Sequence, residues 1–137
     1  MKKSVFSILM MALVLCLGLT SCGGGGDTPG KIVEKYYRAA AAGDADQVIS
    51  LMDLSGIDAE LVKAVTEGMK TDIPKAKEID AQVKSFEIVK EEISADGKTA
   101  TVEFKANCYD KEKGDQTLNE TANLVKTDQG WKMQMAF

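Results

Sequence analysis

The chain of 137 residues contains no histidine, two prolines and three cysteines, and aromatic residues make up 6% of it. Without histidine, neither a Ser-His-Asp nor a Cys-His catalytic site can form, and the commonest zinc sites are excluded too. Basic residues are fewer than acidic ones, 17 against 21. Because nucleic-acid binding depends on a basic face, this balance argues against nucleic acid as a partner. A chain of this length forms one small domain at most.

The first 21 residues have the layout of a secretory signal peptide. Lys2 and Lys3 precede an apolar run from Val5 to Leu19, and small residues follow at once. The run is shorter than the ~20 residues that a membrane-spanning helix needs, and no stop-transfer pattern follows it. A removed signal is therefore predicted over residues 1–21 in preference to a transmembrane helix.

The end of this segment, Leu19-Thr20-Ser21-Cys22, resembles the bacterial lipobox. There an apolar residue and two small ones precede a cysteine that is diacylated and exposed by cleavage, which implies lipidation of Cys22. Two or more acyl chains, such as palmitate, hold a protein stably on a membrane without crossing it. The alternative is a plain signal peptide with an incidental cysteine. Residues 22–27 are glycine-rich and are expected to form a flexible tether.

The resemblance to lipoproteins also implies a location. A glycine after the lipidated cysteine, rather than an aspartate, favours the outer membrane in lipoprotein sorting, and the periplasmic and surface sides both stay open. Cys16 lies in the removed segment and Cys22 would be a thioether, so Cys108 is left as the one free thiol. We expect it to be a buried strand cysteine rather than a nucleophile, since no histidine can activate it.

The remaining residues, 28–137, are expected to begin with helices. Thr28 and Pro29 can start a helix that Gly43 ends, with one apolar face made by Ile32, Val33, Tyr36, Tyr37 and Ala40. Asp44 has the capping-box spacing for a second, short helix that continues to Met52. After a breaker at residues 53–56, apolar residues every four positions predict a third helix that ends before Pro74. Residues 70–80 are expected to be a solvated connector.

The second half of the domain has the pattern of strands. Strands are predicted over residues 83–93, 99–108, 117–127 and 131–137, separated by turns at 95–98, 109–115 and 128–130. Such a series predicts an antiparallel meander of four strands. Helices followed by strands, rather than alternating with them, indicate an α+β fold with the helices on one face of the sheet.

Residues 28–137 resemble the small cystatin-like or nuclear transport factor 2-like (NTF2-like) lipoprotein domains of unknown function that are abundant in Bacteroidetes. The opening helix from Pro29 to Tyr37, the second helix ending Leu51-Met52, and the closing Leu124-Val125-Lys126 and Gly130-Trp131-Lys132 carry the resemblance. These are packing motifs without chemistry. They imply a curved sheet wrapped on helices, with a cone-shaped cavity that relatives fill with side chains, a ligand or a catalytic site.

Four residues are candidates for lining this cavity: Tyr36, Tyr37, Glu120 and Trp131. The tyrosines are most simply core residues. Glu120 has the alternation parity of the apolar Leu118 and Ala122, so it is either an inward carboxylate with a raised pKa or a residue that a β-bulge or an edge strand leaves in solvent.

Two functions remain open. The first is a non-enzymatic envelope lipoprotein that binds a small molecule, a glycan or another envelope protein, with a homodimer through the sheet as a further option. The second is a small isomerase or dehydratase with Glu120 or Asp53 as base and Tyr36 or Tyr37 as proton donor. The sequence predicts no cofactor and no metal site, because the acidic turn at 110–115 lacks the acceptor and glycine positions of a calcium loop.

Overall fold

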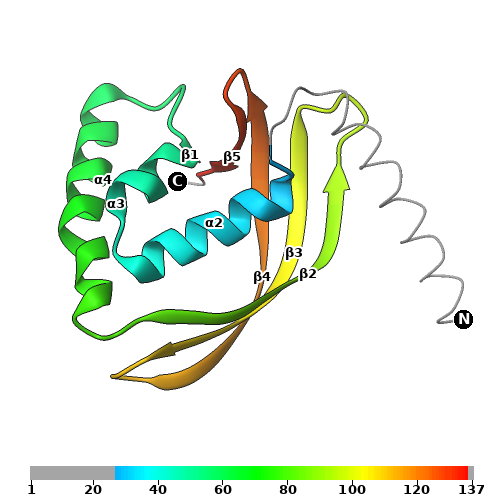
Figure 1. Cartoon of the computed structure of the whole chain (residues 1–137). Helices are drawn as coiled ribbons and strands as arrows, with labels where there is room; N and C mark the ends of the chain where they lie inside the picture. The colour runs from blue at the N-terminus through cyan, green and yellow to red at the C-terminus, as the bar shows by residue number, and fades with distance from the viewer. Residues whose placement is uncertain (1–26, 136–137) are drawn as a thin grey trace, which may run out of the picture.

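The computed structural model describes residues 27–135, which form three α-helices, a 3₁₀ helix and a five-stranded sheet. The predicted signal peptide, the lipidation site Cys22 and the C-terminal Phe137 lie outside these residues. In chain order come α2 (Pro29–Ala42), α3 (Ala45–Ser50), β1 (Met52–Asp53), α4 (Ala59–Asp72), η1 (Ile73–Lys77), β2 (Gln82–Ile93), β3 (Thr99–Asp110), β4 (Gly114–Thr127) and β5 (Gly130–Gln134). Helix α2 crosses one face of the sheet, with α3 and α4 beside it (Figure 1).

The predicted helices are confirmed, and local capping explains where they start and stop. Thr28 Oγ1 accepts a hydrogen bond from the N–H of Lys31, and Gly43 ends α2 with a φ of 75° that favours glycine. Asp44 caps α3 through the N–H of Gln47. The predicted connector at 70–80 is wrong in part, since α4 continues to Asp72 and η1 follows it.

The strand order is β1-β5-β4-β3-β2, so the predicted antiparallel meander is confirmed for β2 to β5. Strand β1 adds a fifth, parallel strand through the pair Met52 with Met133. The sequence placed Met52 in a helix, because two residues are too short to show a strand period. The predicted turn at 109–115 is wrong in length, since β3 continues to Asp110 and β4 begins at Gly114.

Helix α2 is fixed against strand β2 at both ends. Near its start, the N–H of Gly30 donates to Glu91 Oε1 at 2.8 Å, which places a carboxylate at the positive end of the helix dipole. A Cβ on Gly30 would lie 2.2 Å from Ile88 Cδ1, so only glycine permits this approach without displacing Ile88. Near the helix end, Arg38 Nη1 donates to the carbonyl of Val83 at 3.2 Å.

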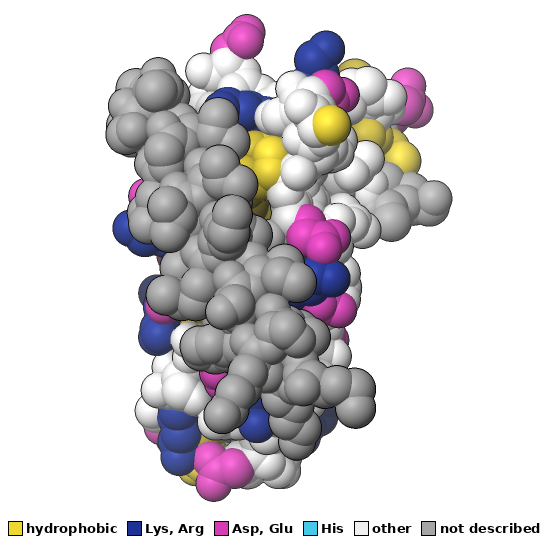
Figure 2. Space-filling model, turned by 90° about the vertical axis from the view of Figure 1, so that its right-hand side faces the viewer, with side chains coloured by type: hydrophobic (Ala, Val, Ile, Leu, Met, Phe, Trp, Pro, Cys, Tyr) yellow, Lys and Arg dark blue, Asp and Glu magenta, His cyan; other side chains and the backbone are white. Residues whose placement is uncertain are grey.

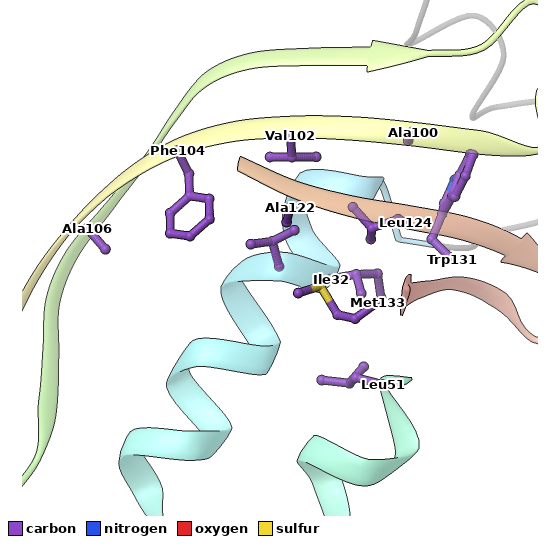
Figure 3. Packing of buried hydrophobic residues seen from close by; sticks show 11 residues of the cluster. Ile32, Leu51, Ala100, Val102, Phe104, Ala106, Ala122, Leu124, Trp131 and Met133 are labelled. Atoms are coloured by element: carbon purple, nitrogen blue, oxygen red, sulfur yellow. The ribbon is translucent and has the colours of Figure 1, made fainter. Parts of the chain in front are cut away.

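The core lies between α2 and the face of the sheet that α2 covers. Val102, Phe104 and Leu124 are at most 2% exposed, and they point from β3 and β4 toward Ile32 of α2 and Leu51 (Figure 3). A second, smaller cluster joins Ala39, Val48 and Met52, with Met135 packed against it. The face that carries the β2 edge displays lysine or arginine together with aspartate or glutamate side chains (Figure 2).

Candidate functional site

Four aromatic rings meet on the helix-facing side of the sheet, where β2 and β3 bend past α2. We call Tyr36, Tyr37, Phe86 and Phe104 the aromatic cluster. Phe86 and Phe104 stack at 5.0 Å between ring centroids with an interplanar angle of 15°, and Tyr37 lies 5.0 Å from Phe104. Phe104 is 2% exposed, whereas the other three rings are half-buried. The cluster therefore combines the buried ring of Phe104 with three rings that are still partly exposed to water.

One tyrosine of the aromatic cluster, Tyr37, forms a hydrogen bond with Glu120, the acidic residue that the sequence singled out. Tyr37 Oη donates a hydrogen bond to Glu120 Oε2 at 3.0 Å, from α2 across to β4. Burial raises the pKa of Tyr37, and the hydrogen bond to Glu120 and the charge of Glu120 raise it further. The phenol therefore stays protonated at neutral pH and holds the carboxylate beside the rings. Burial alone raises the pKa of Tyr36.

Glu120 lies on the inner face of β4 and is nevertheless exposed. The register of β3 with β4 runs without a shift from Thr99 with Val125 to Asp110 with Gly114, so no β-bulge turns Glu120 away. Strand β5 pairs only with Leu124–Thr127, so within residues 27–135 the earlier part of β4 is an edge. Figure 1 shows this part of β3 and β4 extending beyond α2. Water therefore reaches the Glu120 side chain because α2 does not cover this end of the inner face.

The surface next to Glu120 is mostly apolar. Phe104 lies opposite Glu120 on β3, half-buried Leu118 follows on the same face of β4, and Phe86 adds a ring from β2. Cys108 lies farther along β3, opposite Gln116. Cys108 has the predicted inner parity, but it is less buried than expected, and burial raises the pKa of its thiol. Among residues 27–135, no lysine or arginine forms a salt bridge with Glu120. The arrangement can accept a hydrogen bond or a positive charge beside apolar surface.

The other residues proposed from the sequence lie elsewhere. Trp131 is 7% exposed at the opposite end of the core from Phe104 (Figure 3), with Lys126 Nζ 5.7 Å from its ring centroid. Asp53 is on β1, where its Oδ1 accepts hydrogen bonds from Ser55 Oγ and the N–H of Ser55 at 2.7 and 3.2 Å. The structure thus brings together Tyr36, Tyr37 and Glu120, and it separates them from Trp131 and Asp53.

Sequence reasoning did not single out Phe86, because a phenylalanine in a strand is usually a core residue. The pairing of β2 with β3 places its ring diagonally beside Phe104, and α2 brings Tyr37 to both. The available signal was the alternation that placed Phe104 on the inner face of its strand.

The rest of the described part of the chain offers less support for a binding site. An open depression of about 580 Å³ lies between the end of α2, α3, α4 and η1, and its charged residues are of both signs: Asp44, Asp46, Lys70 and Lys77. Among residues 27–135, no group of three or more acidic or cysteine side chains is arranged to hold a metal ion. No helix within that range is long and apolar enough to cross a membrane.

Known structures share this fold at low sequence identity. An NTF2-like protein from Campylobacter jejuni matches with a TM-score of 0.61 and 18% identity, over 80% of this chain and 100% of that chain. A SEC-C motif containing protein from Rhodopseudomonas palustris matches with a TM-score of 0.54 and 17% identity, over 76% of this chain and 73% of that chain. A protein of unknown function with a cystatin-like fold from Nostoc punctiforme matches with a TM-score of 0.51 and 9% identity, over 76% of this chain and 84% of that chain.

These likenesses confirm the expected fold and leave activity open, because the identities are low. Among curated proteins, none matches the chain. The family model described as YchJ, middle NTF2-like domain, matches residues 36–135, which include the aromatic cluster and Glu120. The chain therefore belongs to this family of NTF2-like domains.

Proposed function

We propose that this chain is a lipid-anchored bacterial envelope protein whose NTF2-like domain binds a small ligand without catalysing a reaction. The hydrogen bond from Tyr37 Oη to Glu120 Oε2, beside the half-buried ring of Phe86, is the observation that carries the binding role. It fixes an acceptor at the border of an apolar surface, which is the usual composition of a ligand site.

The residues around the pair define what kind of ligand it would take. Glu120 accepts hydrogen bonds and attracts positive charge, while Phe86 and Leu118 offer apolar surface. A ligand with a flat apolar body and an amine or N–H group at one end matches both features, because aromatic faces also attract cations. A glycan or a segment of another envelope protein that presents such a group would use the same contacts.

The binding role is tested with a matched pair of probes, tyramine and 4-ethylphenol, which share a ring and differ in the amine. We expect tyramine to shift the NMR signals of Phe86, Leu118 and Glu120 more than 4-ethylphenol does. Glu120→Gln should abolish this difference, whereas Tyr36→Phe should leave it unchanged. Equal shifts from the two probes, or an unchanged preference in Glu120→Gln, would contradict the proposal.

The anchor is supported by the sequence alone, through the lipobox at Leu19 to Cys22 and the glycine-rich residues after it. Mass spectrometry of the protein from bacterial membranes should find acylated Cys22 as the first residue. In the control variant Cys22→Ala no acyl chain can be attached, so the protein should be lost from the membrane fraction. An intact Met1, or an unmodified Cys22 in the native protein, would refute the anchor and would leave the binding proposal standing.

A second candidate function, an isomerase or dehydratase, is favoured by one observation, the contact between a carboxylate and a phenol on the inner side of the sheet. Glu120 would act as base and Tyr37 as proton donor. The exposure of Glu120 weighs against it, because such chemistry benefits from excluding water. Substrate turnover that Glu120→Gln abolishes would favour this function over simple binding.

A further inference from the structure

Strand β4 has an unpartnered edge within the described residues. It runs from Gly114 to Thr127, but β5 pairs only with Leu124–Thr127. Residues 114–123 therefore have β3 on one side and no strand of residues 27–135 on the other. We call the open side of residues 114–123 the β4 edge. Figure 1 shows this part of the sheet projecting beyond the helices.

The backbone groups that point out from the β4 edge follow from hydrogen bonds nearby. The N–H of Lys126 donates to the carbonyl of Lys98 at 2.8 Å, toward the β3 side. Because successive residues of a strand point their N–H and C=O groups to opposite sides, the odd-numbered residues point away from β3. Thr117, Asn119 and Thr121 thus direct outward donors and acceptors that pair with no strand of residues 27–135, from a stretch whose register with β3 is regular.

The opposite edge of the sheet is protected in a way that the β4 edge is not. Strand β2 has register shifts between Val83 and Ser85 and between Ile88 and Lys90, and it carries both lysines and glutamates. Bulges and lysines are the devices by which proteins keep edge strands from pairing. The β4 edge has no register shift, no proline and no lysine, although it carries Asp115 and, on the inner face, Glu120. It is therefore less protected than β2, and a partner strand has to place neutral residues opposite these two charges.

We propose that the β4 edge pairs antiparallel with the β4 edge of a second copy of this chain, about a two-fold axis at Leu118. In this register the first copy's Leu118 lies opposite the second copy's Leu118. The other opposed pairs are Gln116 with Glu120, Thr117 with Asn119, and Asp115 with Thr121. Each pair is complementary, and no two like charges are opposed.

Neighbouring registers are less favourable. An axis at Glu120 would oppose two carboxylates, and an axis at Asn119 would put Leu118 opposite Glu120. Like charges directly opposite destabilise a sheet. A leucine opposite a carboxylate gives the leucine no apolar contact and the carboxylate no hydrogen-bond donor. An axis at Thr117 would put Leu118 opposite Gln116 and so lose the leucine pair. Self-complementarity thus favours the register at Leu118, and a second copy of the chain as the occupant.

The pairing would also complete the candidate site. The second copy's Gln116 would lie opposite Glu120, next to the contact with Tyr37 Oη. The amide nitrogen of Gln116 carries two hydrogens and donates to Asp110 Oδ2 at 3.0 Å within its own chain, so one hydrogen is left for Glu120 of the other copy. The dimer does not depend on ligand binding.

Sedimentation of the full-length chain in detergent micelles tests the assembly. We expect a dimer that Asn119→Pro converts to a monomer, because proline removes an outward N–H of the β4 edge without removing a bond to β3. Asn119→Ala keeps that N–H and should stay dimeric. A monomeric native chain, or a dimer that persists in Asn119→Pro with native melting behaviour, would overturn the proposal.

Disulfide cross-linking tests the register. It also tests the dimer by a second route if Asn119→Pro fails to fold. Leu118 would face its counterpart in a non-hydrogen-bonded pair with Cα atoms about 4.5 Å apart, which suits a disulfide. With Cys16, Cys22 and Cys108 replaced by serine, Leu118→Cys should form a covalent dimer on oxidation. Asp115→Cys, about 20 Å from its counterpart in this register, should not. Equal cross-linking at both positions, or at neither, would refute the pairing.

Discussion

Removal of the Tyr37 hydroxyl tests whether the bond to Glu120 is formed in solution. A hydrogen bond to a charged group contributes about 1.5–3 kcal/mol to stability when it is shielded from water. Tyr37 is half-buried and Glu120 is exposed, so water competes for both groups and the contribution falls below this range. We expect Tyr37→Phe to lower the free energy of unfolding by about 1 kcal/mol, because the ring stays in place and only the donor is lost.

A double-mutant cycle in urea measures this bond. Tyr37→Phe, Glu120→Ala and the double variant should give a coupling energy of about 0.5–1 kcal/mol, with unchanged denaturant dependence. Tyr36→Phe is the matched control, since its hydroxyl forms no hydrogen bond with a side chain of residues 27–135. A coupling energy indistinguishable from zero would show that Tyr37 and Glu120 do not interact, and it would remove the basis of the binding proposal.

Two further predictions concern the aromatic cluster. Phe104→Ala should destabilise the domain by about 3–5 kcal/mol, because it removes a ring that is 2% exposed, whereas the outward Lys105→Ala should change stability by less than about 0.5 kcal/mol in the same urea titration. A cost below about 1 kcal/mol would contradict the packing described for Phe104. The raised pKa of Tyr37 predicts that stability present below pH ~10, the ordinary tyrosine pKa, is lost as pH rises further and the folded phenol ionises. Tyr37→Phe should weaken this alkaline loss; an identical pH profile would show that Tyr37 is not its source.

Most of the fold could be predicted from the sequence, because its signals are local. Thr28 and Gly43 mark the ends of α2, and the strict alternation after Thr99 marks β3. Strand β1 was missed because its two residues are held by pairing with β5, a contact that joins distant parts of the chain. The loop before β4 was predicted too long, because charged residues are typical of turns and of exposed strand ends alike.

The candidate site could be predicted only in part. The sequence singled out Tyr37 and Glu120 separately, and no spacing in the chain showed that they meet. Phe86 was not singled out, and Trp131 was grouped with residues from which the structure separates it. This site is assembled by the packing of α2 on the sheet and by the pairing of β2 with β3, which no single segment encodes.

The sequence by itself determined that a histidine-free, acidic chain forms helices followed by strands, and that its first 21 residues are basic and apolar in composition. These properties follow from composition and periodicity, which act within one segment. The tertiary structure decided that Glu120 is both inward and exposed, and that β4 has an edge that no other strand of the described residues covers. The exposure follows from the end of the sheet extending beyond α2, and the open edge follows from the early end of β5 at Gln134. Only the structure could show that the residues lacking a neighbour lie beside the aromatic cluster.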